Sequence, residues 1–119
     1  MKIAISSVDG KLESPVEQRF GRCPMFIIYD TETDQVDTLD NSASLNSPGG
    51  AGIQTSQAIS NAGVDVVITG HLGPNAFRTL KAAGIKGYSG IGMTAQEAIK
   101  ALKDGKLTNL AGADVAGHW

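Results

Sequence analysis

The 119-residue chain has a single cysteine, few aromatic residues and no long apolar run. One cysteine cannot form a disulfide within the chain, so a reducing, cytoplasmic compartment is expected. No apolar stretch approaches the roughly 20 residues that cross a bilayer, and the stretch at the N-terminus is too short for a signal peptide. These absences predict a cytoplasmic protein that has no membrane partner.

An excess of charge of one sign is also lacking. Lys and Arg number 10, Asp and Glu number 12, and the formal net charge is −2. Because the basic residues are scattered, no basic stripe is present to bind a phosphate backbone, and we expect no nucleic-acid partner. Hydrophobic residues make up 41% and aromatic residues only 5%, beside 15 glycines, which predicts a globular domain with an aliphatic core and many tight turns.

The first part of the chain predicts three strands, of which the second and third form a hairpin. Isoleucines alternate with smaller residues over Lys2–Ser7, and a loop without clear periodicity follows at 12–22. Met25–Asp30 is rich in β-branched and aromatic residues, as strands are. A polar turn at 31–34 then leads into an antiparallel arm at 35–39.

From Pro48 onward the pattern changes to alternating helices and strands. Ser47 is a suitable N-cap with Pro48 at the first helical position, and Thr94 with Glu97 forms a capping box. The expected elements are a helix after Pro48, a buried strand at 64–69, a helix at 74–83, a strand at 85–88 and a helix from Thr94 to near Gly105.

This order predicts an α/β fold with a mixed five-stranded sheet and helices on its faces. Alternating strands and helices give parallel strands with right-handed crossovers, and the initial hairpin adds an antiparallel strand. We expect one cofactor-binding domain over 1–107 and a flexible tail over 108–119.

Two glycine-rich turns lead into helices and predict a ligand-binding cleft. Ligands of open α/β sheets bind beyond the carboxyl ends of the parallel strands, where helix N-termini favour anions. The same glycines could serve only to make tight turns, and neither turn matches a P-loop or a full dinucleotide fingerprint. The candidate residues are Gly49, Gly50 and Gly52 in the first turn and Gly70, His71, Gly73 and Asn75 in the second.

A third candidate segment contains the only cysteine. Arg19 and Arg22 flank Cys23, and nearby positive charge favours the thiolate, which is both a metal ligand and a nucleophile. Arg22 and Cys23 therefore join the cofactor-binding candidates, with Cys23 and His71 as candidate metal ligands. The alternatives are a small buried cysteine at the start of a strand, and a histidine that is merely polar at a strand end.

Several of these segments resemble the dinitrogenase iron–molybdenum cofactor biosynthesis family, which includes the NifX and NafY proteins and the C-terminal part of NifB. The resemblance rests on Phe20-Gly21-Arg22, on the glycines of 49–52, and on Thr69-Gly70-His71-Leu72-Gly73-Pro74-Asn75-Ala76-Phe77. It runs from residue 1 to about residue 107 and is most specific over 70–85. Arg19 stands where many members have a histidine.

The resemblance implies a ribonuclease-H-like fold with three α/β/α layers. It also implies a non-catalytic carrier of an iron–molybdenum or other molybdenum/iron–sulfur cluster, accessory to cofactor biosynthesis. Cluster-assembly proteins and a second copy of the chain are the partners it suggests. The chemistry is compatible, because backbone N–H groups and Arg hydrogen-bond to cluster sulfurs, while Cys or His ligates a metal.

Two other functions remain to be weighed against a carrier. A ribonuclease-H-like nuclease needs converging carboxylates on metal ions, but Asp9 and Asp30 adjoin turns and Asp65 begins its strand. A nucleotide- or phosphate-compound-binding regulatory module needs only the helix N-termini and is kept as the alternative. A docking module for another protein has no specific signal in the sequence.

Overall fold

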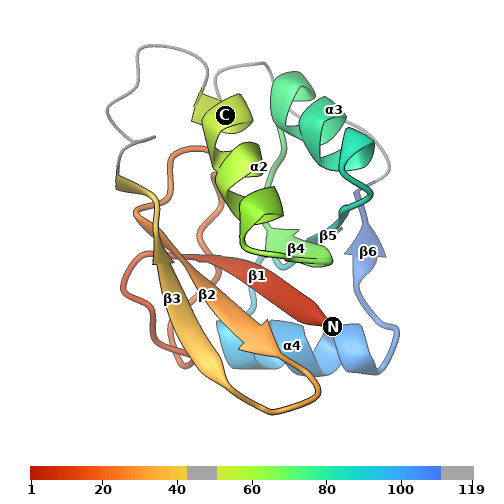
Figure 1. Ribbon diagram of the computed structural model, residues 1–119. Coiled ribbons are helices and arrows are strands. Elements are labelled where there is room, and N and C mark those ends of the chain that lie inside the picture. The colour runs from red at the N-terminus through yellow and green to blue at the C-terminus, as the bar shows by residue number, and fades with distance from the viewer. Residues whose placement is uncertain (43–50, 111–119) are drawn as a thin grey trace.

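The computed structural model describes residues 1–42 and 51–110 (Figure 1). Its strands are β1 (Lys2–Ser7), β2 (Met25–Asp30), β3 (Val36–Asp40), β4 (Val66–Thr69), β5 (Lys86–Ser89) and β6 (Thr108–Asn109). Its longer helices are α2 (Ala51–Asn61), α3 (Pro74–Ala82) and α4 (Ala95–Lys103). The described strands form one sheet in the order β3-β2-β1-β4-β5-β6, in which β1, β4 and β5 are mutually parallel.

The sheet is covered on both faces, which gives three layers. Helices α2 and α3 lie side by side on one face and α4 lies on the other (Figure 1). In the central register, Ile5 pairs with Ile27 of β2 and with Ile68 of β4, and all three side chains pack in the core on the α4 side. Ala4 and Val67 point to the opposite face and pack beneath α2 and α3.

The predicted α/β class is confirmed, but the sheet has one strand more than the five expected. Thr108 pairs with Ser89 and Asn109 with Tyr88, and the Leu110 amide donates to the Gly87 carbonyl at 2.8 Å. This edge strand forms the first two residues of segment 108–119, which was predicted to be a flexible tail. The two residues of β6 are both polar and show no alternation of hydrophobic and polar side chains. This strand therefore forms because β5 offers an edge with which it can pair. Residues 111–119 lie outside the described residues, and a domain limit at 107 stays a prediction.

In the described parts of the chain, no helix has the length and apolar character needed to cross a membrane.

Helix α4 offers a local test of the fold. The Thr94 hydroxyl accepts a hydrogen bond from the Glu97 amide at 3.2 Å, and the Glu97 carboxylate accepts one from the Thr94 amide at 2.9 Å. Thr94→Ala removes the cap and should lower the free energy of unfolding by about 1 kcal/mol in urea titrations. Thr94→Ser should retain most of the stability, and equal losses in both variants would contradict a capping role.

Candidate anion-binding site

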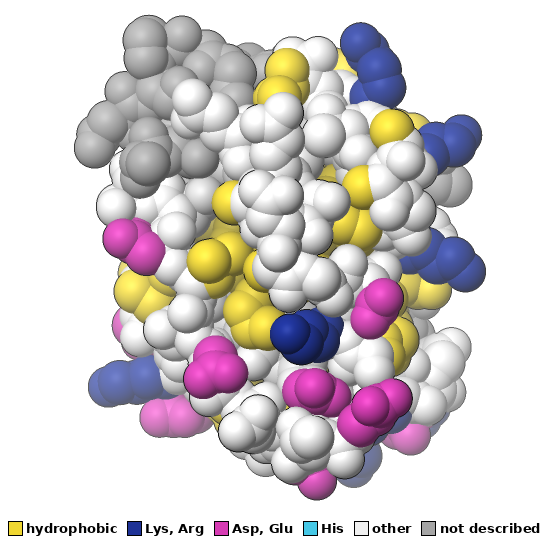
Figure 2. All heavy atoms as spheres, in the orientation of Figure 1, with side chains coloured by type: hydrophobic (Ala, Val, Ile, Leu, Met, Phe, Trp, Pro, Cys, Tyr) yellow, Lys and Arg dark blue, Asp and Glu magenta, His cyan; other side chains and the backbone are white. Residues whose placement is uncertain are grey.

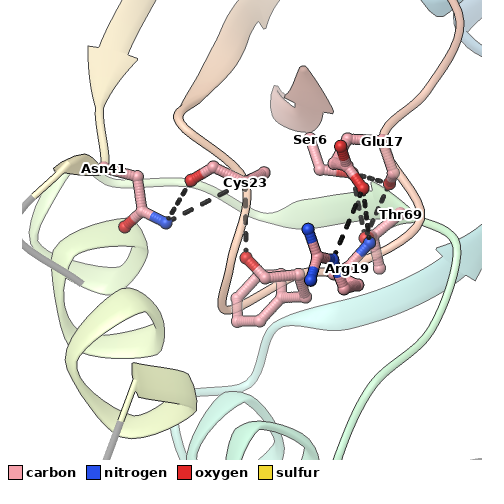
Figure 3. Close-up of polar contacts among 7 residues, drawn as sticks. Ser6, Glu17, Arg19, Cys23, Asn41 and Thr69 are labelled. Atoms are coloured by element: carbon pink, nitrogen blue, oxygen red, sulfur yellow. Dashed lines mark hydrogen bonds and ion pairs between the residues drawn. The ribbon is translucent and has the colours of Figure 1, made fainter. Parts of the chain in front are cut away.

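A loop of the protein itself lies across the carboxyl ends of β1 and β4. The Glu17 amide donates to the Ser6 carbonyl at 2.9 Å, and the Ser6 hydroxyl donates to the Glu17 carbonyl at 2.6 Å (Figure 3). The buried Thr69 hydroxyl lies 2.9 Å from the Ser6 hydroxyl. The crevice beyond these two strands, where open sheets of this class bind ligands, is therefore occupied by residues 14–19.

Close contact with this loop explains why residue 70 is a glycine. A Cβ at Gly70 would lie 2.5 Å from the Gln18 Cα and 2.7 Å from the Gln18 carbonyl oxygen. The next residue, His71, donates its amide to the same carbonyl at 2.7 Å. The glycine expected to let a ligand approach the backbone here lets the Gln18 backbone approach.

The N-termini of α2 and α3 meet at one point beside the covered crevice. Gly52, in the first turn of α2, approaches so closely that a Cβ there would lie 3.2 Å from the Ala76 Cβ and 3.3 Å from the Ala76 amide nitrogen. The buried Ser56 hydroxyl adds a contact of 3.4 Å to the Ala76 carbonyl. Two helix dipoles of about +0.5 charge each therefore add their effects at this point.

The start of α3 leaves its first amides without a side-chain cap. Gly73 is the N-cap residue and supplies no side-chain hydrogen bond, and Pro74 follows at the first helical position. Asn75, half-buried, lies in the same first turn. Uncapped amides at a helix N-terminus suit an anion. Gly49 and Gly50, the other predicted glycines, lie outside the described residues.

Residues 14–19, the covering loop, place the positively charged residue Arg19 near the start of α3. Arg19 forms a parallel backbone bridge with His71, two residues before the N-cap. The Arg19 side chain is 53% exposed, and its Nε lies 4.0 Å from the Glu17 carboxylate (Figure 3). His71 and Arg22 were among the predicted site residues and Arg19 was not. Arg19 had been noted as a neighbour of Cys23 in sequence and as the residue found where many similar sequences have a histidine.

The charges on the visible face of the molecule are unevenly spread. Figure 2 shows acidic side chains mainly over the lower part, toward the β2–β3 hairpin turn and mixed there with some Lys or Arg, whereas several further Lys and Arg side chains line the edge beside α3. Helix α3 itself carries the exposed residues Arg78 and Lys81. The long-range field therefore favours an anion near α3 over one near the hairpin.

Cys23 does not have the thiolate character expected from its neighbours. Its side chain is fully buried, and its thiol donates to the Phe20 carbonyl at 3.4 Å. Burial raises the pKa of Cys23 to about 12, and the Glu17 charge opposes the thiolate as well. The thiolate prediction was wrong, because the arginines that flank Cys23 in sequence do not compensate for the desolvation of the sulfur.

The carboxylates considered for a nuclease do not converge. Asp65 accepts from the Lys2 amide at 2.9 Å and Asp30 pairs with Lys2, so both lie at the amino end of β1. Asp9 follows the carboxyl end of β1, where the Ser14 hydroxyl donates to it at 2.7 Å and lowers the pKa of the carboxyl. Within residues 1–42 and 51–110, no three His, Cys, Asp or Glu side chains group as a metal site would require.

The described residues form a small α/β domain in which Arg19 and His71 lie beside the start of α3. The chain belongs to the dinitrogenase iron-molybdenum cofactor family, which matches residues 1–105.

Relatives of known structure share the whole fold. The apo form of the orange protein from Desulfovibrio gigas superposes with a TM-score of 0.93 at 36% identity, covering 96% of each chain. A NifB-like protein from Thermotoga gives a TM-score of 0.84 at 41% identity, covering 98% of each chain. An uncharacterized protein of Methanocaldococcus jannaschii is 34% identical over 110 residues, 90% of this chain and 89% of that protein.

Because Gly70 packs against the Gln18 backbone, adding one methyl group at position 70 should have a large effect on stability. Gly70→Ala should lower the free energy of unfolding by about 1–3 kcal/mol, because the new Cβ overlaps the Gln18 backbone. Gly52→Ala meets only a tight contact with Ala76 and should cost less. Urea titrations of both variants measure the difference, and a Gly70→Ala protein as stable as wild type would disprove the close approach.

The raised pKa of Cys23 predicts a stability change at alkaline pH. Because the folded value of about 12 exceeds the ordinary 9.0, the neutral thiol favours the folded state fully below pH 9.0, and this contribution is lost as pH rises toward 12. The stability advantage of wild type over Cys23→Ala should therefore shrink by roughly 1–2 kcal/mol between pH 7.5 and 10.5. A pH-independent difference would argue for an exposed thiol.

Proposed function

We propose that this protein is a non-catalytic carrier of an anionic molybdenum/iron–sulfur cluster and that it acts as an accessory to cofactor assembly. The observation that carries this proposal is the meeting of the α2 and α3 N-termini at Gly52 and Ala76. Membership of the dinitrogenase iron-molybdenum cofactor family supports a metal–sulfur cluster over other anions as the ligand. Proteins that supply or receive the cluster are the partners this role implies.

The proposed contacts are mainly hydrogen bonds to the outside of the cluster. Sulfur atoms of such clusters accept hydrogen bonds from backbone amides and guanidinium groups. Gly52, Gly73 and Asn75 contribute through the first turns of the two helices, and Arg22 and Arg19 contribute positive charge. His71 is the one side chain proposed as a direct metal ligand, through a neutral ring nitrogen.

Cys23 is left out of the proposed binding set. A metal would have to reach a fully buried sulfur and replace its proton, against a pKa of about 12. The adjacent residue, Arg22, is half-buried and stays in the set.

The test uses tetrathiomolybdate as the cluster-like probe. Anaerobically purified protein should retain molybdenum through a desalting column, and the affinity from absorption titrations should fall as salt is raised, because exposed charges are screened. Arg19→Gln and Arg22→Gln should each weaken binding by roughly threefold to tenfold, equivalent to about 0.7–1.4 kcal/mol. Lys100→Gln removes one positive charge from α4 on the opposite face and should leave the affinity unchanged.

Two results would contradict the proposal. If wild type retains no molybdenum, the site does not bind this class of anion. If ATP or inorganic phosphate raises the melting temperature while tetrathiomolybdate does not, the protein is the phosphate-binding regulatory module instead. Equal losses of affinity in Arg22→Gln and Lys100→Gln would show that the protein binds the anion, but at a different place from the proposed site.

A further inference from the structure

A buried amide joins three segments of the chain next to the proposed site. Asn41 is 5% exposed and follows β3 directly. Its backbone amide donates to the Pro24 carbonyl at 2.9 Å, and its side-chain Nδ2 donates to the Cys23 carbonyl at 2.8 Å (Figure 3). Its Oδ1 accepts a hydrogen bond from the Thr55 hydroxyl of α2 at 3.1 Å. Asn41 thus ties the arginine-bearing loop to α2.

The Asn41 amide makes two different kinds of hydrogen bond at this junction. Its Nδ2 donates to the Cys23 carbonyl and its Oδ1 accepts from the Thr55 hydroxyl, and a carboxylate of similar shape could not donate the first of these bonds. Thr55 is fully buried, so its hydroxyl has no exposed route to water if Asn41 is lost.

The junction lies close in sequence to both sides of the proposed anion site. The Cys23 carbonyl that Asn41 holds directly follows Arg22. Thr55 is one turn along α2 from Gly52, where α2 meets α3. A shift of Asn41 would therefore move Arg22 relative to the two helix N-termini, without removing any group that contacts the ligand.

We infer that Asn41, with Thr55, is a positioning residue that fixes Arg22 relative to the paired N-termini of α2 and α3. This inference rests on the proposed function. Asn41 contributes to affinity only through Arg22. Residues that orient binding groups in this indirect way commonly change metal-site affinity by about tenfold or more when they are replaced.

The experiment compares nearly isosteric variants at Thr55 with a truncation at Asn41. Thr55→Val removes the hydroxyl and Thr55→Ser retains it, while Asn41→Ala removes both amide groups without adding charge. At a temperature where all variants are folded, Thr55→Val and Asn41→Ala should each weaken tetrathiomolybdate binding by no more than Arg22→Gln does, roughly threefold to tenfold. Thr55→Ser should bind nearly as well as wild type. Thr94→Ala is the control for general destabilisation on the opposite face and should bind like wild type.

A double-mutant cycle separates positioning from ordinary loss of stability. If Thr55→Val acts by misplacing Arg22, then Arg22→Gln should cause little further loss of affinity in the Thr55→Val background. Fully additive losses would overturn the inference, as would wild-type affinity in Thr55→Val and Asn41→Ala. Both of these results leave the proposed function intact, provided wild type binds the probe. A wild-type protein that takes up no tetrathiomolybdate overturns both proposals.

Discussion

The close approach of Gly70 to the backbone of Gln18 is the constraint on which the site depends. A side chain at position 70 would push the covering loop away from β1 and β4, and would break the His71 amide bond to the Gln18 carbonyl. With the loop in place, Arg19 lies beside His71, and residues 14–19 cover the carboxyl ends of β1 and β4. The first turns of α2 and α3 meet nearby, and the positive ends of their two helix dipoles add at that point.

This arrangement favours recognition by charge and hydrogen bonds over a set of covalent metal ligands. Amides fixed in helix turns need no reorganisation when an anion arrives, and a pair of helix ends acts at no cost in side-chain entropy. The one cysteine is used as a core residue beneath this surface, and its thiol and carbonyl interact with Phe20 and Asn41. The proposed carrier role would suit such contacts, since an anion held without strong ligand bonds is also released readily.

Much of the fold was predictable because local patterns determine it. The β-branched runs of β1, β2 and β4, the capping box of α4 and the Gly-Pro start of α3 each reflect forces within a few residues. The strand β6 was missed because its two polar residues acquire structure only from the edge of β5. Of the predicted site residues, His71, Gly73 and Asn75 lie at or just before the start of α3, whereas Arg19 became a candidate through its bridge to His71.

By itself, therefore, the sequence determined the order of strands and helices, the absence of disulfides and the presence of a glycine-rich entry into α3, since these follow from composition and short-range pattern. Tertiary structure decided what each of these residues faces. It turned Gly70 toward Gln18, set Gly52 against Ala76 and enclosed Cys23 in the core. Contacts between residues 18 and 70, or 52 and 76, depend on how the sheet and helices pack, and a thiol's pKa depends on its burial more than on its sequence neighbours.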